Sequence, residues 1–466
     1  MTVSAFFKNK IVRFFIAIIV ALIIAFIPPP AGLTAVSMRW VAIFVCLIML
    51  MSLSVFQDYL CALFCLTALL VFRVGDVGVV FSQFASGTLW SIISILGFAA
   101  AIQKTTILTR VTVNVLRIFP KSYGGQIAAI MTASLVMALL IPSIYAKIVI
   151  LTGIALSIAK VGGFERGSKP AAGLFCALLV TGYWLSNTFI TGNPNVQVMM
   201  AFMGQPMHFW EWLSGTWLWA IIMTAGTYGF IMLYYRPKPS VPVASDYVDR
   251  QIAEMPPITM HDKYTAVIVC LALILWATEP WTGITALVTT LMALVAFSGV
   301  GVLTPEDFVT RIDWKMVVTI GGIMSIADFI GPMGVTAWLA VNVGPIVAPV
   351  VGNVWLFMPA LVVMAFLLRF VVVSMLGSLA IFVAIFQGLV IPMGFHPFIV
   401  VFVANMTIQT WAASYNNVLV MPVYTITQNK LGTHQHVRWM AYALVAMSIV
   451  AYMASIPMWR MVGLLP

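Results

Sequence analysis

Apolar segments about as long as a bilayer is thick follow one another along almost the whole chain. A helix needs about 20 apolar residues to cross the hydrocarbon core of a membrane. Only 8% of the 466 residues are charged, against about 25% in soluble domains, so lipid must surround much of the fold. The sequence predicts an all-α polytopic membrane protein, a single membrane domain over residues 1–466, with eleven crossings near 11–28, 39–54, 58–73, 88–103, 171–203, 214–235, 264–278, 284–303, 315–331, 397–425 and 438–458.

The basic residues predict how these crossings are oriented. Lys and Arg accumulate in cytoplasmic loops of membrane proteins. With the N-terminus in the cytoplasm, alternating sides leave only Arg39, Arg73 and Arg460 on the outer side. The net charge of +10 is therefore interpreted as an orientation signal, and a nucleic-acid partner is not expected. We expect a multi-pass protein of a bacterial cytoplasmic (inner) membrane.

The order of segments predicts two repeats with inverted topology. The charge pattern requires the stretches 125–160 and 345–392 each to enter and leave on one side, as re-entrant hairpins do. A polar, proline-rich stretch lies at mid-chain, and Trp90 with Gly97 has a counterpart in Trp314 with Gly321. The predicted division is an N-terminal helix and loop at 1–38, a first repeat at 39–235, a cytoplasmic linker at 236–263 and a second repeat at 264–466.

Each predicted repeat has a hairpin and then a crossing interrupted by residues that cannot all continue a helix. Carriers built from inverted repeats bind their substrate at such broken helices, near the midplane. The alternative is that single Gly, Ser and Asn residues only pack helices. The pattern predicts substrate contacts from Ser143, Lys147, Thr191, Asn193, Asn195, Arg369, Ser374, Ser378, Ser414, Asn416 and Asn417.

Two basic residues, Lys147 and Arg369, lie within apolar segments that contain no acidic residue. A cation in the hydrocarbon region costs at least a few kcal/mol and is usually kept for function. Pairing with Asp58 or Asp328, or snorkelling of Lys147 to the interface, remain alternatives. Together the two cations favour an anionic substrate.

At these segments, from about residue 84 onward, the chain resembles the divalent anion/sodium symporter family of the ion transporter superfamily. The bacterial dicarboxylate and tricarboxylate exchangers are the most similar branch. The resemblance rests on Pro142, Ser143 and Lys147 in the first hairpin and on Ser374 in the second. It implies eleven crossings, two inverted repeats, two hairpins and two broken helices in a homodimer that moves its substrate by an elevator-type mechanism.

The family places an Asn and a Thr after the hairpin serine, and this chain has lost both, with Tyr145 among the replacements. The resemblance implies that a coupled cation would be held by Ser143, Gly192 and Ser374. The loss of the Asn and Thr disfavours sodium coupling, and Tyr145 adds an aromatic face that suits a substrate with an apolar part.

The predicted function is secondary transport of a small organic anion, a di- or tricarboxylate, by alternating access with anion exchange favoured. Sodium-coupled symport is the first alternative, and an anion channel or a non-transporting membrane subunit is the second. The chain shows no phosphate loop, nucleophile elbow or metal-spaced His pair, so neither an enzyme nor a cofactor is expected.

Overall fold

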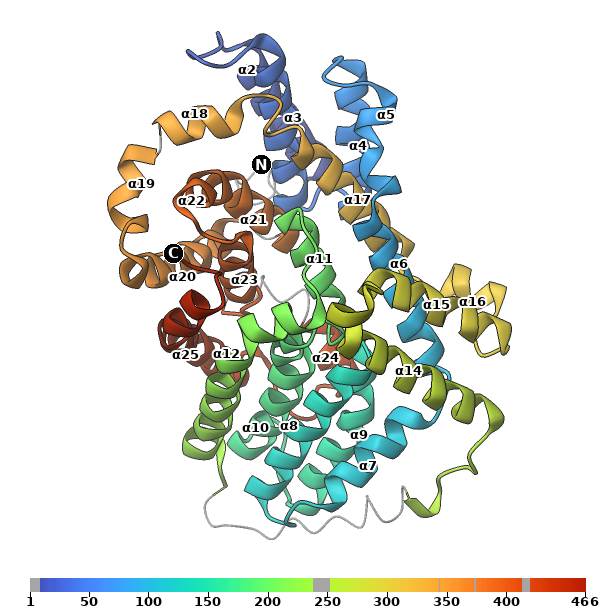
Figure 1. The fold of residues 1–466 in the computed structure, drawn as a ribbon. Coiled ribbons are helices and arrows are strands. Elements are labelled where there is room, and N and C mark those ends of the chain that lie inside the picture. Colours follow the sequence, from blue (N-terminus) through green and yellow to red (C-terminus); the bar gives the residue numbers. More distant parts are fainter. Residues whose placement is uncertain (1–8, 238–251, 343, 373, 413–419) are drawn as a thin grey trace.

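The computed structural model describes residues 9–237, 252–342, 344–372, 374–412 and 420–466, and all regular structure in these ranges is helical (Figure 1). Eight helices are long and apolar enough to cross a membrane, or nine if one bent pair counts as a single span. The chain is therefore a polytopic membrane protein. The eight are α3 (Ala35–Ser52), α8 (Tyr123–Leu140), α9 (Ile144–Val161), α12 with η4 (Phe209–Tyr235), α14 (Met260–Thr282), α20 (Val354–Val371), α21 with its extension (Met375–Met393) and α25 (His434–Met461).

Every predicted crossing contains helix in the structure, although the number of complete crossings stays a prediction. The bent pair joins α6 (Gly87–Gln103) to α7 (Ile107–Arg117) at 71°. The other spans and connections are α2 (Lys10–Phe26), α4 (Asp58–Val71), α5 (Val77–Val80), α10 (Lys169–Leu179), α11 (Pro194–Met203), α15 (Ala286–Gly299), α16 (Pro305–Thr310), α17 (Trp314–Asp328), α18 (Val335–Asn342), α19 (Gly344–Val351), α22 (Gly388–Val390), α23 (Pro397–Ile408) and α24 (Met421–Ile426).

Helix pairs occupy both stretches predicted as hairpins. In the first, α8 ends at Leu140 and α9 begins at Ile144, because Pro142 supplies no N–H and Ser143 caps the new helix. In the second, α20 ends at Val371 and Ser374 caps α21. Each hairpin therefore turns at a serine that starts its second helix.

The two halves of the chain carry their elements in the same order. The series α6–α7, hairpin α8–α9, broken span α10–α11 and α12 is matched by α17–α18, hairpin α20–α21, α23–α24 and α25. Most of the predicted linker 236–263 lies outside the described residues. The inverted relation and the domain limits stay predictions.

One end of the molecule gathers three loops that the charge pattern assigns to the cytoplasm. The Tyr235 hydroxyl donates to the His436 carbonyl at 2.9 Å, and the Lys169 ammonium lies 4.6 Å from the centre of the Tyr234 ring. Arg236 and Arg438 flank the same contacts. Because these basic groups share one end, the orientation prediction is internally consistent, and the side of the membrane stays a prediction.

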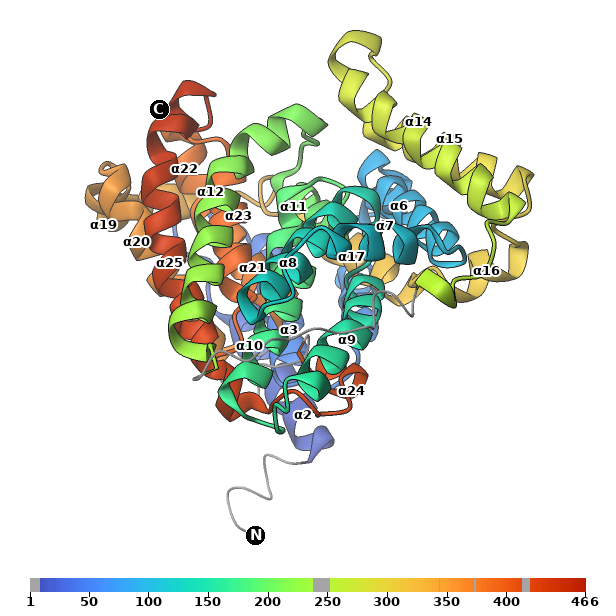
Figure 2. The ribbon, with the colours of Figure 1, turned by 90° about the horizontal axis from the view of Figure 1, so that it is seen from below.

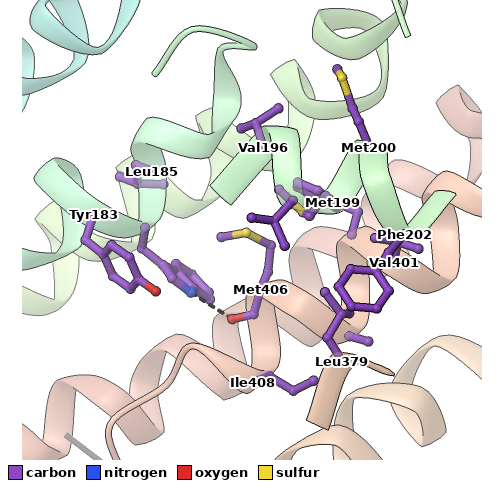
Figure 3. Packing of buried hydrophobic residues seen from close by; sticks show 14 of the residues in the cluster. Tyr183, Leu185, Val196, Met199, Met200, Phe202, Leu379, Val401, Met406 and Ile408 are labelled. Atoms are coloured by element: carbon purple, nitrogen blue, oxygen red, sulfur yellow. Dashed lines mark hydrogen bonds between the residues drawn. The ribbon is translucent and has the colours of Figure 1, made fainter. Parts of the chain in front are cut away.

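The halves meet in a buried apolar core around α11 and α23. Trp184 donates its indole N–H to the Met406 carbonyl at 2.7 Å, and the surrounding cluster includes Met199 of α11 and Val401 of α23 (Figure 3). In a second view α14 and α15 stand beside α6 (Figure 2), and α14 also reaches α12, where the Trp210 indole N–H donates to the Ala277 carbonyl at 2.7 Å. Burial of these apolar side chains fixes the broken span of the first half against the second half.

Candidate functional site

A cavity of about 670 Å³ lies where both hairpin turns and the broken span of the first half converge. Pro142 to Tyr145 line it from the first hairpin, Asn193 to Asn195 from the broken span and Ser374 to Leu376 from the second hairpin. Segments more than 200 residues apart in the sequence thus share one space. The polar residues that line it are Ser54, Asp58, Gln103, Ser143, Tyr145, Tyr183, Asn193, Asn195, Arg311, Asp313, Ser374 and Asn405.

Three helices begin at this cavity. The Ser143 hydroxyl accepts a hydrogen bond from a backbone N–H of α9 at 3.3 Å, and the Ser374 hydroxyl accepts one from α21 at 3.1 Å. The Asn193 side-chain oxygen accepts from the Asn195 N–H of α11 at 2.9 Å. A helix N-terminus carries partial positive charge and free N–H groups, so three of them around one cavity favour an anion.

The broken span passes through a π-helical turn (η2, Val180–Trp184) and a 3-10 turn (η3, Leu185–Thr188) before α11 begins. A Cβ atom on Gly192 would lie 2.0 Å from the Ser186 carbonyl oxygen, so only glycine fits there. The Thr191 hydroxyl donates to the Leu139 carbonyl at 3.0 Å. The break is therefore held by close backbone contact and by the end of α8.

Lys147 stabilises this break from outside the cavity. Its side chain is fully buried, and its ammonium donates to the Gly192 carbonyl at 2.5 Å. Lys147 is absent from the described residues that line the cavity. In this structure it therefore orders the loop that carries Asn193, and it does not snorkel; the predicted contact with an anion stays a prediction.

Arg369 has a comparable place in the second hairpin. Its guanidinium donates to the Val372 carbonyl at 2.8 Å, and the Ser378 hydroxyl donates to the Ser374 carbonyl at 2.8 Å. Arg369 and Ser378 are both buried, and neither lines the cavity. They stabilise the turn whose tip residue, Ser374, lines the cavity.

The predicted contacts from Ser414, Asn416 and Asn417 lie outside the described residues. Just before them, Asn405 of α23 lines the cavity. The second half therefore reaches the cavity through its hairpin tip and through α23.

Sequence reasoning missed Arg311, which lines the cavity together with Asp58 and Asp313. Among the described lining residues Arg311 is the one lysine or arginine. Arg311 lies between the predicted crossings 284–303 and 315–331, where a basic residue is interpreted as an orientation signal. A polar residue at the start of a neighbouring helix, such as the N-cap Asp313, was the available clue.

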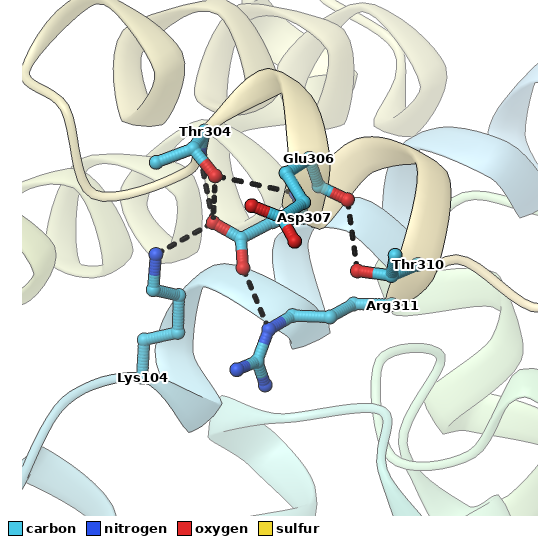
Figure 4. A network of polar contacts seen from close by, with 6 residues as sticks. All are labelled: Lys104, Thr304, Glu306, Asp307, Thr310 and Arg311. Atoms are coloured by element: carbon cyan, nitrogen blue, oxygen red, sulfur yellow. Dashed lines mark hydrogen bonds and ion pairs between the residues drawn. The ribbon is translucent and has the colours of Figure 1, made fainter.

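Asp307 positions Arg311 (Figure 4). The Asp307 carboxylate accepts from the Arg311 Nε at 2.7 Å and from the Lys104 ammonium at 2.6 Å. The Thr304 hydroxyl adds a bond at 2.6 Å. The hydrogen bond from Lys104 makes the largest contribution, followed by those from Thr304 and Arg311. Together they hold the pKa of Asp307 well below its usual range. The network is therefore charged at neutral pH and weakens only as the pH falls toward that lowered pKa.

Arg311→Gln is expected to raise the anion concentration needed for half-maximal binding by about tenfold or more, since a charge-assisted bond is lost. Asp307→Asn should have a smaller effect, because the guanidinium remains but is less well oriented. Titration of purified protein measures both. Arg117→Gln, on an exposed arginine of α7, is the control and should bind normally. Equal binding by all three variants would exclude Arg311 from the site.

A second cavity of about 640 Å³ lies on the other side of the broken span. It reaches Gly87 at the start of α6, whereas the first cavity reaches Gln103 at the end of the same helix. Thr191 lines the second cavity and Asn193 the first. Residues 191–193 therefore form a partition between the two spaces.

The family model for the sodium:sulfate symporter transmembrane region matches residues 8–465. The chain belongs to this family. That membership confirms the resemblance drawn from the hairpin and broken-span residues. Sodium:sulfate symporters are transporters, so the chain is classed with membrane carriers and not with enzymes.

Curated relatives of this sodium:sulfate symporter family member are about equally distant. The chain is 23% identical over 347 residues to dicarboxylate transporter 1 of spinach chloroplasts, a match that covers 71% of this chain and 60% of that protein. It is 23% identical over 357 residues to the inner membrane protein YbhI of Escherichia coli, covering 72% and 73%. The match thus spans less than two thirds of the spinach protein.

Solved structures share the fold of this family member at low identity. The YdaH transporter of Alcanivorax borkumensis matches with a TM-score of 0.53 at 13% identity, covering 84% of this chain and 89% of that one. MtrF of Neisseria gonorrhoeae, from a class of antimetabolite efflux pumps, matches with a TM-score of 0.55 at 14% identity, covering 96% and 93%. These likenesses concern the fold alone.

Proposed function

We propose that this protein is a secondary carrier of a small organic anion, a di- or tricarboxylate, that works by elevator-type alternating access with anion exchange favoured. The observation that carries the proposal is the cavity at which α9, α11 and α21 begin and which Arg311 lines. Helix N-termini and a guanidinium are donors that suit carboxylate oxygens. The spinach relative, named as a dicarboxylate transporter, supports the same substrate class.

Exchange is favoured over sodium coupling because the predicted cation ligands already accept other hydrogen bonds. The hydroxyls of Ser143 and Ser374 accept from their own helices. The Gly192 carbonyl accepts from the Lys147 ammonium, and this fixed positive charge disfavours a sodium ion bound beside it. A fixed charge also disfavours movement of the empty site through lipid, because it would cross uncompensated.

The location and the orientation in the membrane are also part of the proposal. The basic end of the molecule supports a cytoplasmic N-terminus in a bacterial inner membrane, the location that the name of the YbhI relative states for that protein. A homodimer and the absence of any cofactor are part of the proposal.

Uptake assays with purified protein in liposomes test the proposed anion exchange. Vesicles loaded with unlabelled succinate, malate or citrate should take up the same labelled anion, whereas empty vesicles should not, with or without a sodium gradient. Accumulation in empty vesicles only when sodium is present would replace exchange by symport. Uptake of none of the anions under either condition would reject the carrier proposal.

A further inference from the structure

The wall of the first cavity is apolar over much of its area. Away from the hairpin tips and Asn193 it is lined by Met51, Leu96, Val198, Met316 and Ile320. Methionine side chains adapt to irregular apolar groups and make favourable contacts with aromatic rings. A small dicarboxylate that needs only hydrogen-bond donors would leave this wall uncovered.

Two tyrosines line the same cavity, one from the first hairpin and one from the broken span. Tyr145 follows the cap of α9 and remains 40% exposed, whereas Lys147 and Ile148 in the same turn are buried. Tyr183 lines the cavity from the broken span, and its hydroxyl is close enough to that of Tyr145 to interact electrostatically. Aromatic rings at one edge of a ligand cavity favour a flat apolar group.

The charges on the wall separate a polar side from an apolar one. Asp313 is close enough to Tyr145 to interact with it electrostatically, and Asp58 lines the same cavity. A carboxylate of the substrate that lay against the Tyr145 ring would therefore meet like charge. An uncharged body against the ring would not, while a carboxylate of the same anion binds the backbone N–H groups at the start of α9, next to that ring, and Arg311.

We propose that the carried anion combines carboxylate groups with an apolar body of about the size of an aromatic ring, and that Tyr145 is the residue that selects for this body. The inference rests on the proposed function and narrows its substrate class. The volume of about 670 Å³ accommodates such a ligand.

Calorimetric binding to the purified protein, with anions matched in charge, tests this selection. The pairs are succinate with phenylsuccinate and acetate with phenylacetate. In each pair the phenyl compound is expected to bind about tenfold more tightly or better, because the ring covers apolar surface. Equal or weaker binding of the phenyl compound in both pairs would overturn the inference.

Variants assign the selection to the ring of Tyr145. Tyr145→Ser should abolish the preference, and Tyr145→Phe should keep it. The matched control is Tyr264→Ser, because Tyr264 is also 40% exposed but lies on α14 and is not among the described residues that line the cavity. A preference that persists in Tyr145→Ser would overturn the role of Tyr145. Succinate exchange in liposomes reports separately on the proposed function, so its presence without any phenyl preference rejects the inference alone.

Discussion

Lys147→Met is expected to lower anion exchange by about 10- to 100-fold while the protein stays folded. Methionine keeps the apolar stem of the side chain but loses the ammonium that holds the Gly192 carbonyl. A buried hydrogen bond to a charged group is worth about 1.5–3 kcal/mol, and the loop that carries Asn193 would lose its support. Lys147→Arg keeps the charge with a different donor geometry and should retain part of the activity. Exchange in loaded liposomes measures the loss.

The matched control for this change is Lys160→Met, in the exposed last turn of the same helix. It should exchange anions at the normal rate. Sodium-driven accumulation in empty liposomes, undiminished in Lys147→Met, would show that the fixed charge has no part in transport.

Asn193→Ala is expected to abolish nearly all binding of the anion. Asn193 caps α11 and also donates its amide to the Tyr183 carbonyl at 3.0 Å, so alanine removes both contacts of a fully buried side chain. Loss of the cap alone costs about 1 kcal/mol. Asn193→Asp keeps the cap acceptor but places a negative charge at an anion site, and it should fail as well. Asn193→Ser should recover part of the binding, since a hydroxyl can cap the helix.

Binding isotherms on protein that elutes as a single species separate these effects from misfolding. Asn114→Ala supplies the control, because Asn114 is exposed and its amide donates to the Arg110 carbonyl within the same helix, α7. Normal binding by Asn193→Ala would mean that Asn193 merely packs the broken span.

The helices of this fold could be predicted because lipid requires long apolar runs. The hairpin turn at Pro142 could also be predicted, since proline ends one helix and a capping serine starts the next. Helix α7 was not predicted, because its residues fall between the predicted crossing at 88–103 and the predicted hairpin at 125–160. The helix contains the exposed Arg117 but also an apolar face with Leu108 and Val113. Packing of that face against the rest of the fold stabilises the helix.

The candidate site was predicted in part. Ser143, Asn193, Asn195 and Ser374 line the cavity, since interruptions in apolar runs can be seen in a sequence. The partner of Lys147 could not be seen, because the Gly192 carbonyl is a backbone group 45 residues away. Arg311 was overlooked because basic residues at the ends of spans usually report orientation.

The partition at residues 191–193 has an electrical consequence. Where the two cavities hold water and open to opposite sides of the membrane, most of the membrane voltage falls across the short length of chain between them. Moving one elementary charge through such a field changes the free energy by about 2.3 kcal/mol per 100 mV. A cycle that carries net charge past Gly192 would therefore run at a rate set by the membrane potential, whereas a one-for-one swap of equally charged anions would be electrically silent.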